Sequence, residues 1–179
     1  MNKKSTPVNA QQNLHPAQDT SGRQASQTDE HDATWDAFVR ALTKPNIINP
    51  DDRSGLDALS TRYPRLFTNE PLPWGLQIGA GWTHLVTVLC ARIDTLLRQA
   101  PSARFHLHEV KEKFGGLRFY YEIHGAPADI KQAIRNSVGQ AELASNDCCE
   151  RCGAVGAKGY SSGYLVTLCP RCASTLEGD

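Results

Sequence analysis

Four cysteines near the end of the chain have the residue type and the spacing of metal ligands. They form two Cys-x2-Cys pairs, Cys149/Cys152 and Cys169/Cys172, with sixteen residues between the pairs. Two residues between paired cysteines let one tight turn direct both thiolates at a single ion, and four thiolates complete the tetrahedron that Zn²⁺ prefers. Four protein ligands leave no open position for water, so the pattern predicts one structural zinc ion.

Two alternatives bear on these cysteines. Cys148 adjoins Cys149, so either residue can complete the ligand set, and the two-residue spacing favours Cys149. A redox Cys-x2-Cys motif normally stands alone near a βαβ pattern, whereas this chain has two pairs. Gly153 follows the first pair and suits the positive φ that such a turn often needs.

The lobe that holds the cysteines is expected to span residues 147–179. Ser161-Ser162-Gly163, followed by an apolar run, predicts a small hairpin over residues 160–168. Only seven residues follow Cys172, enough for a short terminal helix. A zinc ribbon would end in a strand instead, so the pattern favours a treble-clef-like lobe over a zinc ribbon.

The core is expected to be α+β and to span residues 34–146, with the zinc lobe packed on it and residues 1–33 as a disordered polar tail. Apolar residues at helical spacing predict helices, and β-rich runs around Gly115-Gly116 predict a hairpin that turns at those glycines, with Phe114 opposite Leu117. The predicted helices are 34–43, 55–63 (capped by Ser54), 82–99 and 127–145; a brief strand is predicted at 74–78 and the hairpin at 104–124.

The expected hairpin has one charged face that is a candidate contact surface. It carries Lys111, Lys113, Arg118 and Tyr120, which suit a phosphate or an acidic partner, although an ordinary solvated strand face has the same pattern. In the predicted register Glu109 lies opposite Glu122. The same register puts His106 and His108 on one face and His124 on the other, so the histidines do not form a second metal site.

Composition and motifs narrow the function classes. Lys+Arg and Asp+Glu both number 19, so the net charge is zero, which argues against unspecific binding to nucleic acid or to an anionic membrane. We find no P-loop, GxGxxG, HExxH or GxSxG motif, and we therefore expect no enzyme. Without an export signal or a long apolar run, a cytoplasmic protein is expected, where paired cysteines bind metal rather than form disulfides.

Several segments resemble a functionally uncharacterised family of small bacterial and prophage proteins, over about residues 74–173. They are Gly81-Trp82, the KEKFGGLRFY stretch (Lys111 to Tyr120), Ala141 to Ser145, and Cys149 to Gly153. Members of that family carry an acidic residue before the Gly-Trp pair, where this chain has Ala80. The resemblance implies a small accessory protein, such as an immunity protein, an antitoxin or an inhibitor.

The leading expectation is therefore a non-enzymatic, zinc-stabilised protein that binds another protein. In its most concrete form it is an immunity protein that neutralises a bacterial toxin or effector by direct contact, through the face that carries Lys111, Lys113, Arg118 and Tyr120. The alternative is a nucleic-acid-binding regulator that uses the zinc lobe or this basic hairpin face. No membrane partner is expected.

Overall fold

One long hairpin forms the centre of the sheet. Strands β2 (Arg104–Lys113) and β3 (Gly116–His124) pair antiparallel, and the short strand β1 (Leu76–Gln77) adds to β2 in parallel. The computed structural model describes residues 33–68 and 72–176, so the predicted tail lies outside the described residues except for residue 33. The described residues from Trp35 onward belong to one compact unit.

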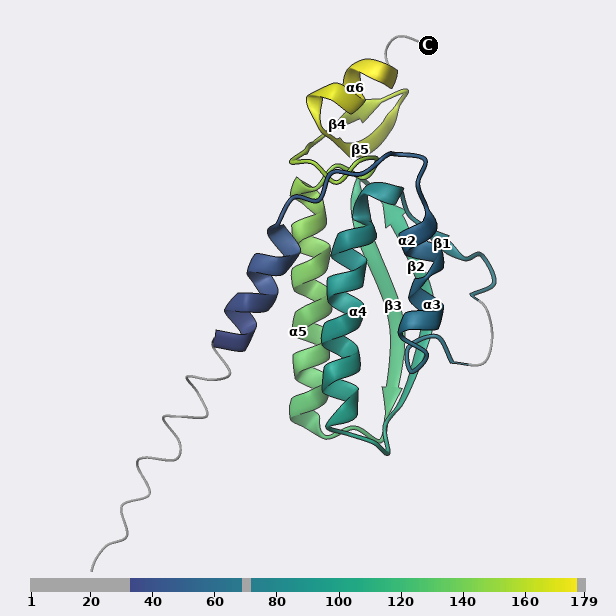
Figure 1. Ribbon diagram of the computed structural model, residues 1–179, viewed down its shortest axis with the longest axis vertical. Helices are drawn as coiled ribbons and strands as arrows, with labels where there is room; N and C mark the ends of the chain where they lie inside the picture. Colours follow the sequence, from purple (N-terminus) through teal and green to yellow (C-terminus); the bar gives the residue numbers. More distant parts are fainter. Residues whose placement is uncertain (1–32, 69–71, 177–179) are drawn as a thin grey trace, which may run out of the picture. The chain divides into compact units, whose positions relative to one another are not determined.

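Two helices cover one face of this sheet. Helices α4 (Thr83–Arg98) and α5 (Ala128–Ala144) lie side by side along β2 and β3 (Figure 1). Their apolar stripes recur at helical spacing, and Leu89 and Ile134 at the centre of these stripes are fully buried. The predictions of an α+β fold and of helices at 82–99 and 127–145 are confirmed, with ends that differ by one residue.

Short elements surround this core. Residues 33–43 are helical, as predicted, but the helix predicted at 55–63 is two single turns, α2 (Ser54–Asp57) and α3 (Leu59–Arg62). Ser54 does not cap them: its amide and hydroxyl both donate to Asp52 Oδ1, at 3.0 and 2.6 Å. The 3-10 turns η1 (Ala80–Trp82) and η2 (Ser145–Asp147) adjoin α4 and α5.

The hairpin turn lies one residue earlier than predicted. Lys113 pairs with Gly116, so the turn residues are Phe114 and Gly115, with φ values of 56° and 66°. Both values suit the primed turns of two-residue hairpins. A Cβ on Gly115 would lie 2.9 Å from the carbonyl carbon of Val166 and 3.2 Å from its Cα, so packing against the C-terminal lobe favours glycine at this turn position. The predicted pairing of Phe114 with Leu117 is wrong.

A register shift at His108 also separates the observed hairpin from the expected one. The pairing changes between Leu107 and Glu109, which is the pattern of a β-bulge. The shift allows Phe105 and Leu107 to face the core together with Val110. Leu107 and Val110 are three residues apart, and in an unbroken strand that spacing would put them on opposite faces. Glu109 consequently lies opposite Tyr120, and the predicted opposition of Glu109 and Glu122 is wrong.

The C-terminal lobe consists of a small hairpin and a short helix. Strands β4 (Ala157–Ser161) and β5 (Tyr164–Leu168) are antiparallel and are followed by α6 (Pro170–Leu176). The turn residues Ser162 and Gly163 have φ values of 48° and 84°. A helix after the last strand is the feature that separates a treble-clef-like lobe from a zinc ribbon.

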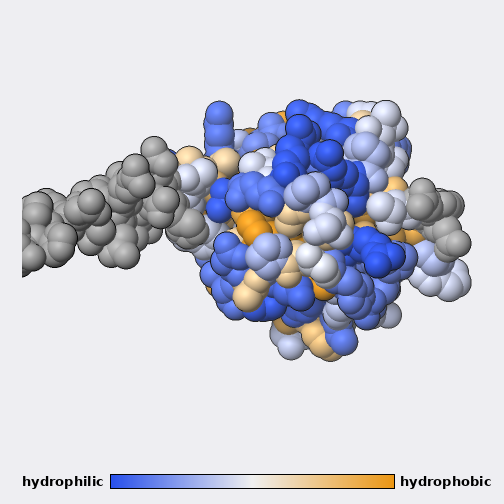
Figure 2. All heavy atoms as spheres, turned by 90° about the horizontal axis from the view of Figure 1, so that it is seen from below, coloured by the Kyte–Doolittle hydropathy of each residue, from blue (hydrophilic) through white to orange (hydrophobic). Residues whose placement is uncertain are grey.

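Figure 2 shows the end of the molecule at which α4 terminates, opposite the C-terminal lobe. Its surface is mainly hydrophilic, with a few hydrophobic residues among the polar ones. In the part of the chain that the structure describes, no helix combines the length and the apolar character needed to cross a bilayer.

Candidate metal centre

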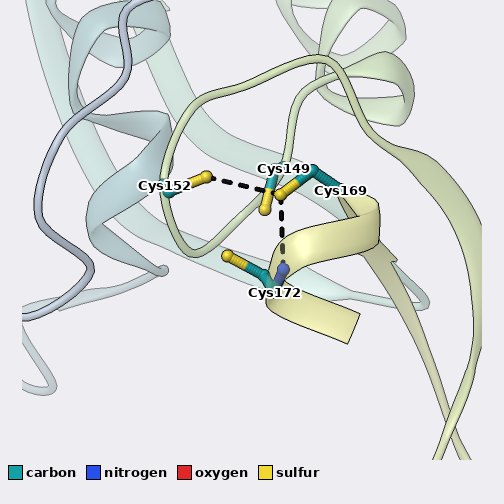
Figure 3. A group of neighbouring side chains, drawn as sticks. All are labelled: Cys149, Cys152, Cys169 and Cys172. Atoms are coloured by element: carbon teal, nitrogen blue, oxygen red, sulfur yellow. Dashed lines mark hydrogen bonds between the residues drawn. The ribbon is translucent and has the colours of Figure 1, made fainter. Parts of the chain in front are cut away.

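The four predicted ligand cysteines come together at the base of the C-terminal lobe. Their sulfur atoms all lie within 4.8 Å of one another, and all four residues are buried (Figure 3). A Zn²⁺ ion with four Zn–S bonds of about 2.3 Å requires sulfurs about 3.8 Å apart. The Cys152 and Cys169 sulfurs, 3.6 Å apart, already approach that spacing. The donor set and its geometry fit one tetrahedral ion.

Two tight turns aim these sulfurs. In the first turn, the Gly153 amide donates to the Cys149 carbonyl at 2.9 Å, and Gly153 has the predicted positive φ, at 77°. The second pair spans the start of α6, where the Cys172 amide donates to Cys169 Sγ at 3.4 Å and the Ala173 amide donates to the Cys169 carbonyl. The bond from the Cys172 amide positions the Cys169 sulfur, and the two bonds to carbonyl oxygens close the turns.

The thiols share their protons unequally. Burial acts to raise the pKa of Cys169, but the Cys172 amide and the neighbouring thiols donate hydrogen bonds to its sulfur and lower that pKa to about 7. Burial, together with hydrogen bonding to Cys169, raises the pKa of Cys152 and Cys172. Metal binding must displace the protons of the thiols that are still protonated, because the thiolate is the metal ligand.

Cys148 does not join the cluster. Its sulfur points to the Gly81 carbonyl, 3.9 Å away, and lies outside the group of four. Burial raises the pKa of Cys148 to about 12, which keeps this thiol protonated. The geometry thus selects Cys149, as the two-residue spacing favoured.

The turn that carries Cys149 and Cys152, which we call the zinc knuckle (residues 149–153), is joined to the start of α4. The Gly81 amide donates to the Glu150 carbonyl at 2.9 Å, and the Trp82 indole Nε1 donates to the Cys148 carbonyl at 2.9 Å. A Cβ on Gly81 would lie 2.2 to 2.6 Å from three knuckle backbone atoms. The Gly81-Trp82 pair stands out in the sequence, but no local pattern indicates this role.

A second contact joins the lobe to the tip of the long hairpin. The buried Thr167 hydroxyl donates to the Gly115 carbonyl at 2.6 Å. The Glu150 amide donates to the Thr167 carbonyl, and the Thr167 amide donates to Glu150 Oε2 at 3.3 Å. Burial raises the pKa of Glu150, while the Thr167 amide partly offsets that effect. Together with the knuckle, these bonds fix the lobe at two places.

The predicted contact surface lies on the face of the hairpin away from the core. Lys111 pairs with Glu109 at 2.7 Å and its Nζ lies 5.3 Å from the centre of the Tyr120 ring. Lys113 Nζ lies 5.4 Å from the centre of the Phe114 ring. Arg118, opposite Lys111, donates to the Leu117 carbonyl. One of the three positive charges of this surface, that of Lys111, is therefore balanced locally, and aromatic rings accompany both lysines.

The histidines are closer together than predicted. The bulge places His106 opposite Glu122 and His124 opposite Arg104, and Glu122 Oε2 lies 3.6 Å from His108 and 3.5 Å from His124. The expectation that His124 faces away from the other two is wrong, because it assumed an unbroken register. Within residues 33–68 and 72–176, only the four cysteines meet the geometry of a metal site.

This chain was compared with known protein families, curated proteins and solved structures. Neither the models of protein families, nor the curated proteins, nor the solved structures yielded a match to this chain.

Proposed function

We propose that this protein is a non-enzymatic binding protein, whose four cysteines hold one structural Zn²⁺ ion and whose exposed hairpin residues contact a protein partner. The buried set of four thiols supports a structural ion, since no ligand position remains for water or substrate. When bound, the ion cross-links the zinc knuckle to α6 and so stabilises the lobe. The protein would act in the cytoplasm, where thiols stay reduced.

Exposed aromatic side chains on the two hairpins, at their tips and, for Tyr120, further along β3, are the observation that carries the binding proposal. Phe114 is 63% exposed, Tyr120 40%, Tyr160 80% and Tyr164 76%. Aromatic residues are enriched at protein interfaces and supply much of the binding energy there, whereas exposing them to water is unfavourable. The bond from Thr167 to the carbonyl of the long hairpin's turn holds the two hairpins together.

The charged residues beside these rings suit a protein partner better than a polyanion. Lys111 is neutralised by Glu109, and the chain as a whole has no net charge. Lys113 and Arg118 add polar contacts around the aromatic residues, as at the rim of a protein interface. In its most concrete form, the partner is a bacterial toxin or effector that the protein neutralises as an immunity protein. The resemblance of the KEKFGGLRFY stretch to a family of small bacterial and prophage proteins supports this form.

Affinity capture tests the proposal. The zinc-loaded chain is immobilised and exposed to extracts of the native host, beside a variant with Phe114→Ala, Tyr160→Ala and Tyr164→Ala. We expect a stoichiometric protein partner on the wild type and its loss from the triple variant. Trp74→Ala is the matched control, because Trp74 is 76% exposed but belongs to neither hairpin tip. Capture of no protein, or equal capture by the triple variant, contradicts the proposal.

The alternative is binding of nucleic acid. Lys113 lies beside the exposed ring of Phe114. Proteins that bind single-stranded nucleic acid use such pairs, in which the cation contacts a phosphate and the ring stacks on a base. This alternative predicts affinity for an oligonucleotide that falls steeply as salt rises. An absence of binding at low salt removes it and leaves the protein-binding proposal untouched.

A further inference from the structure

A cavity of about 610 Å³ lies at the opposite end of the long hairpin from its turn. The residues that line it come from the segment after α3, from the end of α4 and the turn that follows, and from the open ends of β2 and β3. The ten residues of β2 separate the cavity from the hairpin tip by about 30 Å, at about 3.3 Å per residue. Its volume is within the range of about 300–1,000 Å³ that is typical of small-molecule sites.

Basic side chains form part of the wall of this cavity, beside apolar ones. Arg65, Arg98 and Arg104 line it together with His106 and His124. Among the lining residues that the structure describes, Glu122 is the one acidic side chain. An anionic group in the cavity would lie near three arginines, two of which pair with Asp94. Guanidinium groups bind phosphate and carboxylate oxygens through paired hydrogen bonds.

A buried carboxylate positions two of these arginines. Asp94, on α4, is only 8% exposed and accepts hydrogen bonds from Arg98 Nε at 2.9 Å and Arg98 Nη2 at 2.8 Å. Its other oxygen lies 3.6 Å from Arg65 Nη1. The bidentate contact fixes the plane of the Arg98 guanidinium at the edge of the cavity, so less conformational entropy is lost when a ligand binds.

The cavity also has an apolar part. Leu97 and Phe105 line it, and both belong to the core of the protein. Phe105 is held in place by stacking on Tyr121, with ring centres 5.2 Å apart. The surface around this end is hydrophilic, with hydrophobic residues among the polar ones (Figure 2). A ligand that matches both parts has one anionic group and an apolar body.

We propose that this cavity binds a small organic anion, whose phosphate or carboxylate group contacts Arg65, Arg98 and Arg104 while its apolar body lies against Leu97 and Phe105. The site is separate from the hairpin surface, so the proposal does not depend on the protein-binding function.

Titrations of the zinc-loaded full chain followed by amide NMR test this inference. The probes are phenyl phosphate, benzoate and benzyl alcohol, which share one ring and differ in the charged group, and inorganic phosphate, which lacks the ring. We expect saturable shifts at residues around the cavity with phenyl phosphate or benzoate, and weaker ones with inorganic phosphate. The stronger of the two ring-bearing anions tells a phosphate ligand from a carboxylate ligand. Benzyl alcohol should give no saturable shift.

Arginine variants connect the shifts to the cavity. Arg104→Gln and Arg65→Gln should each weaken the bound anion about tenfold, as expected for loss of one charge-assisted hydrogen bond. Neither change removes the bidentate partner of Asp94, so the fold should persist, which unchanged spectra away from the cavity would verify. Arg171→Gln, on α6, is the matched control and should leave affinity unchanged. Lack of saturable shifts with either ring-bearing anion, binding of benzyl alcohol as tight as that of the anions, or wild-type affinity in both cavity variants overturns the proposal.

Discussion

Replacing Gly81 by alanine should detach the zinc knuckle from the start of α4. The added Cβ would lie 2.2 Å from the Cys149 carbonyl oxygen, 2.5 Å from the Gly153 amide nitrogen and 2.6 Å from the Cys152 amide nitrogen. All three are backbone atoms of a turn that the metal ligands hold in place. Because no flexible side chain can move aside, the helix start and the knuckle must separate.

The cost follows from what this separation breaks. Inserting one methyl group into a packed interior costs about 1–3 kcal/mol. The two hydrogen bonds that cross the contact, from the Gly81 amide and from the Trp82 indole, contribute about 1 kcal/mol each. We therefore expect Gly81→Ala to lower the free energy of unfolding by about 3–5 kcal/mol, a large part of the 5–15 kcal/mol that is usual for a domain.

Urea denaturation of the zinc-loaded protein measures this change, and Gly139→Ala provides the control. Gly139 lies inside α5, and a Cβ there would meet nothing within 4 Å. The same substitution should therefore raise the free energy of unfolding by about 0.5–1 kcal/mol, since alanine favours a helix interior. If Gly81→Ala unfolds at the same urea concentration as the wild type, the contact described above does not hold the knuckle.

Four further predictions concern the cysteines and the lobe contact. Cys152→Ser should abolish zinc retention, measured as metal per chain, and lower the free energy of unfolding by an amount on the order of 10 kcal/mol or less. Cys148→Ser should keep one zinc ion. Equal zinc content in both variants would contradict the ligand assignment. Because burial raises the pKa of the Cys90 thiol from 9.0 to about 12, native protein should resist iodoacetamide at Cys90 at pH 8, and rapid alkylation there would refute this. The difference in free energy of unfolding between the wild type and Cys90→Ala should be largest below pH 9 and decline above it, because the thiolate then forms in the unfolded chain alone. A difference that stays constant up to pH 11 in urea denaturation would refute this direction. Thr167→Val should cost about 1–3 kcal/mol in thermal or urea unfolding by leaving a buried hairpin carbonyl without its donor, while Thr95→Val, at an exposed helix position, should change little, and equal effects would argue against the lobe contact.

The features that could be predicted from the sequence are those that local patterns determine. Helices α4 and α5 follow from apolar residues at a spacing of three and four, and the ligand set follows from two Cys-x2-Cys pairs. The position of the hairpin turn did not follow from the sequence, because either Phe114-Gly115 or Gly115-Gly116 could form it. Packing of Gly115 against β5 decides between the two. The bulge at His108 depends on which residues the helices cover, which periodicity alone does not state.

The candidate sites differ in the same way. The metal centre lies within two short stretches of the chain, whereas the cavity combines Arg65, Arg98 and Arg104, which come from three separate segments. No local motif brings these arginines together. Only the return of the hairpin to the end of α4 does so, and Asp94, which orients two of them, reads in the sequence as one more polar residue of a helix.

The contact between the zinc knuckle and the start of α4 also determines when the start of α4 can be completed during synthesis of the chain. Trp82 is made long before its acceptor, because 66 residues separate it from Cys148, and the last metal ligand is made later still. On a translating ribosome, the start of α4 therefore stays without its partners until the carbonyls of Cys148 and Glu150 have left the exit tunnel. A nascent chain that stalls before that point exposes an indole and a glycine edge that a finished molecule conceals.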